Sequence, residues 1–532
     1  MKTVKYLSIL LVAALSFTAC EDWMNAGPEG ATKTADQKAT AAEQNPNAAS
    51  ADIAAIYAQF VQLYSGLGDL GYSRHNDFGY SAICMFTEAQ GMDFVSPNIG
   101  YNWFGFSDWK VIRDNTTTTT QGLITNLVWN EYFKIIHACN NVIEIVDRET
   151  PGSMKYALSQ ALAVRAFCYL QLAQLFQKTY DPATLALPCV PLVVDHMPAE
   201  KQANNPRATV EEVFKLIKTD LDYACDSLKG FTRADKGYVN QAVAFGLRAR
   251  MNLVMQNWAA AAEDAENALQ LSGATPLTIA EASKPGFADN TAHNVLWANI
   301  VVETNDIVQT GIVNWPSHMS TWYGDGYTGV GATRWIASEL FDEIAVSDVR
   351  KGWWLNADLE SPLLNAAGYN VMKADVLAQE TPYLNLKFGT GDGTTSGLGA
   401  AAGDWILMRA EELILIKAEG LARSGGDGAG TLTAFVQQFR DPSYNVGAHG
   451  LSIEDEIWWQ RRVELWGEGF AWGDIVRLNK DIVRSTSSNW PEAWNQDVKA
   501  SSGIYLWRIP QAEIEANAGI SESDNNPVVT FP

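Results

Sequence analysis

Six charged residues near the end of the chain lie at spacings that could do acid–base chemistry. They fall between Gln460 and Arg477 and are Arg461, Arg462, Glu464, Glu468, Asp474 and Arg477. Carboxylates beside cations are residue types that general acid–base catalysis uses. Opposite charges at helical spacing also form ion pairs that hold two helices together, and we favour this structural interpretation. Arg165 and Arg409 lie on otherwise apolar predicted helices, so we expect them to need buried partners, for which the glutamates of this run are candidates.

Aromatic side chains beside polar ones suggest a second chemistry, the binding of sugars. Two long segments, residues 66–122 and 272–403, hold many of the rings among Gly, Asn, Asp and Thr. The apolar face of a sugar ring packs on Trp or Tyr, while its hydroxyl groups bind Asn, Asp or Arg. The same rings could instead form small cores beneath long loops. Our candidate ligand-binding residues are Tyr101, Asn102, Trp103, Trp109, Trp315, Trp322, Tyr323 and Tyr327.

Other catalytic and cofactor signatures are absent from the sequence or out of context. No Gly-Lys dipeptide exists for a Walker A loop, and the six histidines form no metal-binding spacing. Two G-x-G-x-x-G matches begin at Gly66 and Gly324, but neither opens a helix after a strand, so we interpret both as turns. We therefore expect no metal and no cofactor. With 61 acidic residues, spacing alone leaves a pair of glycosidase carboxylates open.

The charge balance argues against nucleic acid and anionic lipid as partners. The 532 residues include 38 basic and 61 acidic side chains, a net charge of −23, with no block of Lys and Arg. Both partners need a basic surface. The overall charge also favours neutral glycans over heavily sulfated ones, unless a local basic patch, for example around Arg74, intervenes.

The first residues are typical of an exported lipoprotein. Lys2 and Lys5 precede an apolar run at residues 7–17, which is too short to span a membrane as a mature helix. Small residues directly before Cys20 resemble a bacterial lipoprotein cleavage site. We therefore predict a signal peptide at residues 1–19, lipidation of Cys20, and a flexible tether at residues 20–51. The alternative is an ordinary secretory signal with an incidental cysteine.

The middle of the chain has the periodicity of paired helices. Apolar residues recur at helical spacing from Val128 onward, Thr209 and Glu212 are placed as a capping box, and a helix over residues 405–422 should end at Gly425. Units of about 33 residues with Trp and Ala at their contacts look like tetratricopeptide repeats. We expect helical hairpins at about 123–271 and 404–480 within one domain at 52–532, with loop-rich inserts at 66–122 and 272–403. The cysteines after Cys20 are expected to be buried and inert.

Several sequence blocks, in order, resemble the SusD/RagB family of Bacteroidetes outer-membrane lipoproteins. Residues 129–146 are similar to a family helix in which Asn140 or Asn141 supplies a characteristic asparagine. Five further blocks carry the resemblance: residues 163–172 (AVRAFCYLQL), the Pro-containing stretch 187–192, 409–418 (RAEELILIKA), 460–477, and Ile509 to Pro510 with Glu513, Ile514, Asn517 and the later residues 525–527. Gln460 and Ala471 depart from the family pattern, where Glu and Arg are usual.

The resemblance implies a mostly α fold, with tetratricopeptide-like hairpins in a right-handed superhelical body and long aromatic-rich inserts. It also implies a non-catalytic lipoprotein, anchored in the outer membrane and exposed on the cell surface. Such a protein captures an oligosaccharide or polysaccharide and delivers it to a SusC-like, TonB-dependent transporter. A peptide-binding protein of the RagB kind is the alternative within the family, and a glycoside hydrolase is the alternative outside it.

Overall fold

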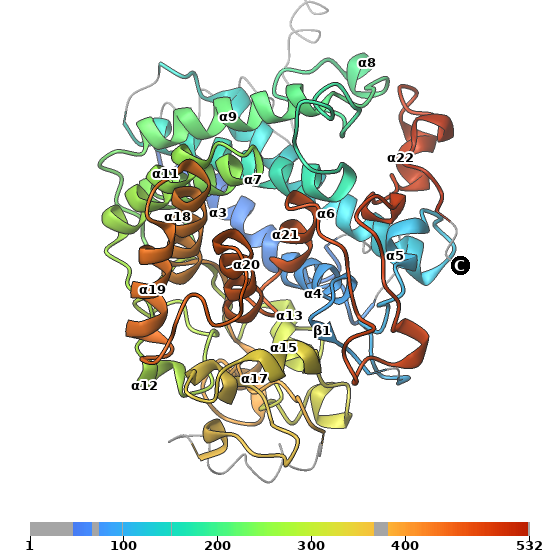
Figure 1. Ribbon diagram of the computed structural model, residues 1–532. Helices are drawn as coiled ribbons and strands as arrows, with labels where there is room; N and C mark the ends of the chain where they lie inside the picture. Colours follow the sequence, from blue (N-terminus) through green and yellow to red (C-terminus); the bar gives the residue numbers. More distant parts are fainter. Residues whose placement is uncertain (1–45, 66–73, 98, 150–151, 366–380, 530–532) are drawn as a thin grey trace, which may run out of the picture.

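The computed structural model describes residues 46–65, 74–97, 99–149, 152–365 and 381–529 (Figure 1). Over these residues the chain is mostly helical with a few short strands, which confirms the predicted fold class. None of the described helices is long and apolar enough to cross a membrane. The predicted signal peptide, Cys20 and residues 21–45 of the predicted tether lie outside the described residues.

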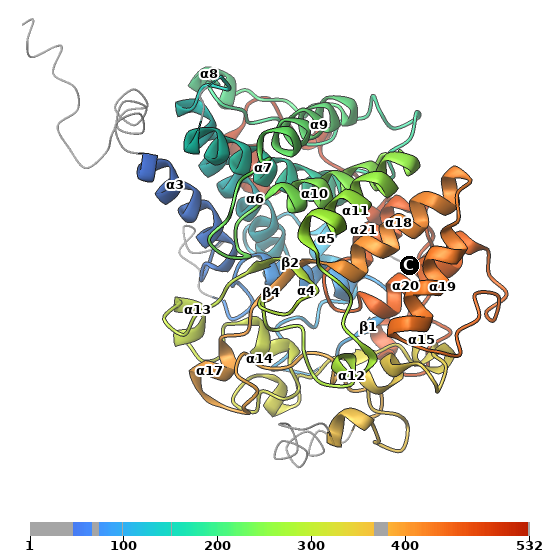
Figure 2. The same ribbon diagram turned by 90° about the vertical axis from the view of Figure 1, so that its left-hand side faces the viewer.

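The body of the molecule is a row of helices in which each packs against the next along the chain (Figure 2). This arrangement confirms the predicted hairpins, while the handedness of the superhelix stays a prediction. The helices of the row are α6 (Thr120–Ile145), α7 (Ser153–Phe176), α9 (Val210–Ser227), α10 (Gln241–Val254), α11 (Trp258–Ser272), α18 (Ala410–Ser424), α19 (Gly428–Phe439) and α20 (Ile453–Glu464).

Local sequence features explain where these helices begin and how they pack. Helix α9 starts with the predicted capping box, in which Thr209 Oγ1 accepts from the Glu212 amide and the Glu212 carboxylate accepts from the Thr209 amide. Helix α7 is buried on nearly every side, because α6, α9 and α3 (Pro46–Ala58) all contact it. Helix α18 lies so close to α11 that a Cβ on Gly420 would be 2.5 Å from the Trp258 carbonyl oxygen.

Three details differ from the sequence prediction. Helix α3 begins at Pro46, inside the predicted tether, because the Ala-rich residues there favour a helix. The long helix expected from Trp405 starts only at Ala410, since Trp405–Arg409 forms strand β4 against β2 (Val295–Asn299). The first insert contains an unpredicted helix, α4 (Tyr80–Gln90), in which every residue is buried.

The two aromatic-rich inserts are joined to each other. Strand β1 (Phe94–Val95) of the first insert pairs antiparallel with β3 (Trp335–Ile336) of the second, with Phe94 opposite Ile336 and Val95 opposite Trp335. Segments about 240 residues apart in the sequence are thereby brought side by side. The five cysteines of the described residues, Cys84, Cys139, Cys168, Cys189 and Cys225, are buried and free, which confirms the prediction for them.

Candidate functional site

A tight turn presents two of the predicted aromatic residues at the edge of the first insert. The Asn102 side chain holds this turn, because its Nδ2 donates to the Pro97 carbonyl oxygen at 2.6 Å and its Oδ1 accepts from the Phe104 amide at 3.1 Å. Asn102 is itself buried, whereas Tyr101 is 65% exposed and Trp103 is half-buried. Asn102 therefore positions the two rings, and the prediction that its amide binds ligand is wrong in this structure because both ends of the amide already have partners.

Four side chains from both inserts meet around Trp103, and we call Arg74, His75, Trp103 and Tyr327 the Trp103 cluster. The His75 ring lies 5.0 Å from the Trp103 ring and 5.9 Å from the Tyr327 ring, measured between centroids. The Tyr327 ring stands at 70° to that of Trp103, and His75 Nδ1 hydrogen-bonds the Tyr327 hydroxyl. The guanidinium carbon of Arg74 lies 5.5 Å from the Trp103 centroid. All four side chains are half-buried, so each keeps some surface for a ligand.

A buried layer beneath the Trp103 cluster holds it in place. His318 stacks on Tyr327, with centroids 4.7 Å apart and planes at 15°, and its Nε2 donates to the His75 carbonyl oxygen at 2.9 Å. Asn76 Nδ2 donates to the Trp103 carbonyl oxygen at 2.8 Å. His318 also stacks on Phe78 and meets the edge of Phe104, with centroids 5.5 Å and 5.0 Å away, and the Arg334 guanidinium carbon lies 5.8 Å from the Phe104 centroid.

Burial sets the protonation of these groups at neutral pH. It lowers the pKa of His75, and burial together with the Arg334 charge lowers the pKa of His318 well below its usual range. Both imidazoles are therefore neutral. Burial raises the pKa of Tyr327, so its hydroxyl stays protonated, and lowers the pKa of Arg334 to about 9, which leaves that group mostly charged at pH 7. The site thus combines aromatic faces, neutral hydrogen-bonding groups and two arginine charges.

Four of the predicted ligand-binding rings belong to the core, and the prediction is wrong for them in this structure. Trp109, Trp315, Trp322 and Tyr323 are each at most 1% exposed. Their polar atoms are used inside the protein: the indole nitrogens of the three tryptophans donate to the carbonyl oxygens of Gln90, Gly403 and Leu386, and the Tyr323 hydroxyl to that of Gly311. A ring enclosed on both faces cannot stack on a sugar.

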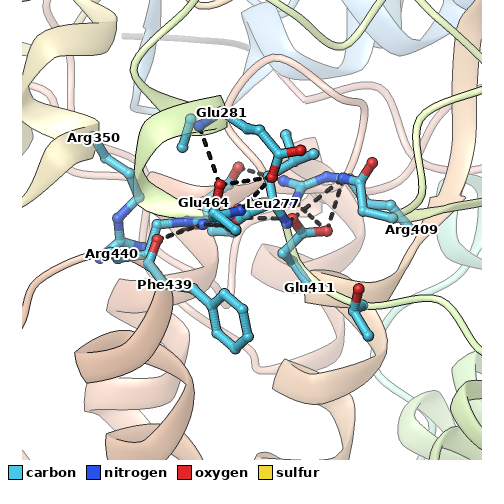
Figure 3. A network of polar contacts seen from close by, with 12 residues as sticks. Leu277, Glu281, Arg350, Arg409, Glu411, Phe439, Arg440 and Glu464 are labelled. Atoms are coloured by element: carbon cyan, nitrogen blue, oxygen red, sulfur yellow. Dashed lines mark hydrogen bonds and ion pairs between the residues drawn. The ribbon is translucent and has the colours of Figure 1, made fainter.

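The charged run at residues 460–477 is an ion-pair network, as the structural interpretation predicted. Figure 3 shows Glu464 at its centre, between Arg350, Arg409 and Arg440. One carboxylate oxygen of Glu464 accepts from Arg409 and Arg440, both at 2.8 Å, and the other accepts from Arg440 at 2.8 Å and Arg350 at 3.3 Å. The side chains of all four residues are at most 1% exposed. Both oxygens of the Glu464 carboxylate are therefore occupied by arginines.

The predicted partners of the buried arginines are correct for Arg409 and wrong for Arg165. Arg409 pairs with Glu464 and with Glu468. Arg165 instead pairs with Asp220 at 2.8 Å and Asp195 at 2.8 Å, because α9 and the segment before it lie directly against α7. Gln460, which departs from the family pattern, still takes part, since its Oε1 accepts from Arg350 at 2.6 Å.

Other hollows within the described ranges could also hold a ligand, and one of about 260 Å³ is lined by Ile53, Tyr156, Phe231 and Tyr238 among others. A groove of about 630 Å³ runs along α6 and is lined by Trp129, Phe133, His137 and Asn141 among others. A cavity of about 70 Å³ is lined by both residues of the Arg250–Glu412 ion pair and by charged side chains of the 460–477 run. No group of three or more His, Cys, Asp or Glu side chains in this part of the chain is arranged to hold a metal ion.

Sequence reasoning missed three of the residues that build the site. It named Arg74 only as a potential basic patch, and it gave no role to His75, His318 or Arg334. Arg74 and His75 are adjacent in the same aromatic-rich insert as Trp103, so the sequence could have indicated them as candidate ligand-binding residues. His318 and Arg334 could not be found, because their contact with the first insert depends on the pairing of β1 with β3.

Comparisons with known proteins agree with the resemblance noted in the sequence. A family model described as "Starch-binding associating with outer membrane" matches residues 85–253, and the model of the SusD family matches residues 353–527. A SusD-like protein of Bacteroides ovatus is 23% identical over 258 residues, which are 47% of this chain and 40% of that relative. The match thus spans well under half of the relative's length.

Solved structures share the fold over nearly the whole chain. A SusD-like carbohydrate binding protein from Bacteroides vulgatus has a TM-score of 0.70 and 21% identity, covering 90% of this chain and 98% of its own. A SusD superfamily protein from Bacteroides thetaiotaomicron has a TM-score of 0.67 and 19% identity, covering 90% and 99%. Together the two family models match more than half of the sequence. The chain belongs to the SusD/RagB family.

Proposed function

We propose that this protein is a non-catalytic lipoprotein of the cell surface that captures an oligosaccharide or polysaccharide at the Trp103 cluster. It then delivers the glycan to a SusC-like, TonB-dependent transporter in the outer membrane. The observation that carries the proposal is the half-buried Trp103 ring with Arg74, His75 and Tyr327 around it. A ring face covers the C–H groups of a sugar, and the polar groups around it bind hydroxyls.

The family comparisons support glycan binding as the general activity. One matching family model is described as starch-binding and associated with the outer membrane, and a structural neighbour is described as carbohydrate binding. Delivery to a transporter and anchoring through Cys20 rest on the family resemblance and on the sequence before residue 46.

The non-catalytic part of the proposal rests on the family comparisons, in which one matching model is described as starch-binding and a structural neighbour as carbohydrate binding. A glycoside hydrolase needs two carboxyl groups flanking the bond that is cut. In the described part of the chain, no ion pair or hydrogen bond joins a carboxylate to Arg74, His75, Trp103 or Tyr327. The carboxylates of the buried network are occupied by arginines.

A glycan-binding screen followed by calorimetry tests the proposal. Loss of one stacking ring should remove about 1 to 3 kcal/mol of binding free energy, by analogy with burial of an apolar side chain. Trp103→Ala should therefore weaken binding of the best glycan by roughly 5- to 150-fold. The matched control is Tyr223→Ala, because Tyr223 is also half-buried and also carries an arginine, Arg148, 5.1 Å from its ring centroid, but lies on α9.

The alternatives give different results in the same experiment. Tight binding of peptides with no glycan bound would favour a peptide-binding protein of the RagB kind. Release of shortened sugars from the bound glycan would favour a glycoside hydrolase. Normal glycan binding by Trp103→Ala would show that the site lies elsewhere, for example in the groove along α6.

A further inference from the structure

The charged side chains around Trp103 have the opposite sign to the protein as a whole. The chain carries a net charge of −23, yet Arg74 lies in the Trp103 cluster and Arg334 in the layer beneath it. Over the described residues, no ion pair includes either of them. A local group of charges of one sign attracts ligands of the other sign, whatever the net charge of the molecule.

Arg74 differs from the buried arginines of the helical body in lacking a carboxylate. Arg165, Arg250, Arg409 and Arg477 are all paired with Asp or Glu at 2.6–2.8 Å. Among the described residues, the Arg74 guanidinium lies against the Trp103 ring, and its Nε is buried without a hydrogen-bond partner there. Its guanidinium group is therefore available to bind an anion beside the ring face, where a bidentate contact with a carboxylate or sulfate would be strong.

Arg334 adds a second positive charge that no side chain compensates. It is 0% exposed, its Nη1 donates to the Ala332 and Thr333 carbonyl oxygens, and its Nε and Nη2 have no partner. Arg484 is also buried without a carboxylate, but it lies between the Trp109 and Trp490 rings, 4.0 Å from each centroid, and donates to several carbonyl oxygens. Arg334 has fewer and more distant contacts of this kind, so its field extends through the low-dielectric layer of Phe104 and His318 toward the site.

We propose that the ligand of the Trp103 cluster is an anionic saccharide, whose carboxylate or sulfate group binds Arg74 while a sugar face stacks on Trp103. This inference rests on the proposed function and narrows it to one class of glycan. It replaces the expectation from overall charge that neutral glycans bind better, because the local charge at the site is positive. Arg334 strengthens the preference without touching the ligand, so it is a positioning and electrostatic residue.

Matched pairs of probes test the charge requirement directly. A short oligogalacturonate is compared with its fully methyl-esterified form, and a sulfated galactan oligosaccharide with its desulfated form, by calorimetry at low and moderate salt. We expect the full-length protein to bind at least one charged probe tenfold or more tightly than its uncharged partner, with a preference that falls as salt rises. The carboxylate and sulfate arms identify which anion the site takes.

Variants separate this inference from the proposed function. Arg74→Gln should remove the preference for the charged probe, Arg74→Lys should keep part of it, and the control Arg148→Gln should leave it unchanged. Arg334→Gln should reduce the preference for the charged probe. Circular dichroism shows whether this variant folds, and if it does not, the Arg74 variants alone test the inference. Trp103→Ala should weaken charged and uncharged probes alike.

The outcomes that overturn the inference are distinct from those that overturn the function. Equal or tighter binding of uncharged glycans, unaffected by Arg74→Gln but weakened by Trp103→Ala, would refute the anionic ligand and leave glycan binding intact. Failure to bind any charged or neutral glycan would refute both.

Discussion

Neutralising Glu464 should destabilise the fold strongly, because three arginines share its carboxylate. Arg350, Arg409 and Arg440 all donate to it, and the side chain is fully buried (Figure 3). The cations of the network are Arg350, Arg409, Arg440 and Lys387, and its anions are Asp348, Glu411, Glu464 and Glu468, so the net charge is 4 − 4 = 0. Glu464→Gln changes this to 4 − 3 = +1.

The expected magnitude follows from the cost of an uncompensated buried charge. Breaking a buried ion pair by removing one partner typically costs about 3–5 kcal/mol. With an unfolding entropy of roughly 2 cal/mol/K per residue over the roughly 460 described residues, this loss lowers the unfolding midpoint by only ~3–5 °C. The free energy of unfolding from denaturant titration is therefore the better measurement. The matched control is Glu263→Gln, an exposed glutamate on α11 without an ion pair among the described residues.

The pH dependence gives an independent check on the same residue. Burial alone would raise the pKa of Glu464, but the Arg440 and Arg409 guanidinium groups outweigh it and hold the pKa well below its usual range. Stability from such a group is present above the unfolded pKa, near 4.5, and is lost as pH falls through the folded pKa. The difference in the free energy of unfolding between wild type and Glu464→Gln should therefore become smaller at acidic pH. A cost below about 1 kcal/mol at pH 7, equal to that of Glu263→Gln, would refute the reasoning.

Three further predictions concern the anchor, the partner and a second buried acid. Cys20→Ala should move the protein from the membrane fraction of cells to the soluble fraction; an unchanged membrane fraction would contradict lipidation. A pull-down in mild detergent, with crosslinking, should recover a large β-barrel transporter; repeated recovery of this protein alone would count against the partner. Burial raises the pKa of Glu131 to about 8, so the folded protein keeps this proton at pH values where the unfolded chain has lost it. The free energy of unfolding of the wild type should therefore fall as pH rises from 4.5 to 8, by roughly 1.4 kcal/mol per pH unit from this group. Glu131→Gln should therefore stabilise the protein more at pH 8 than at pH 5 in denaturant titrations, and an equal effect at both pH values would show that Glu131 is ionised in the fold.

Local sequence signals were sufficient for the helical body. The capping box at Thr209 and the apolar stripes of α6, α9 and α10 are set by residues three or four apart, so they can be read without the fold. Helix α4 was missed because all of its residues are buried and its N-cap is Gly79, leaving neither a polar face nor a capping side chain to detect. The strand at Trp405 was misassigned because a short apolar run fits both a buried strand and a helix, and only its pairing with β2 decides.

The candidate site depended on contacts that the sequence does not encode locally. Trp103 and Trp109 lie in the same insert with similar neighbours, yet one is half-buried and the other is enclosed by Arg484, 375 residues later in the chain. Tyr327 and Trp322 differ in the same way. The pairing of the two inserts decides which rings keep an exposed face for a ligand. Composition therefore identified the right segments but could not distinguish the exposed rings from the buried ones.

The most direct test of the central claim is a crystal structure of the protein with its tightest-binding glycan. The account predicts density for a sugar ring against the exposed face of Trp103, with polar groups of the sugar within hydrogen-bond distance of Arg74, His75 or Tyr327. Density for the glycan in the groove along α6, with the Trp103 cluster empty, would contradict it.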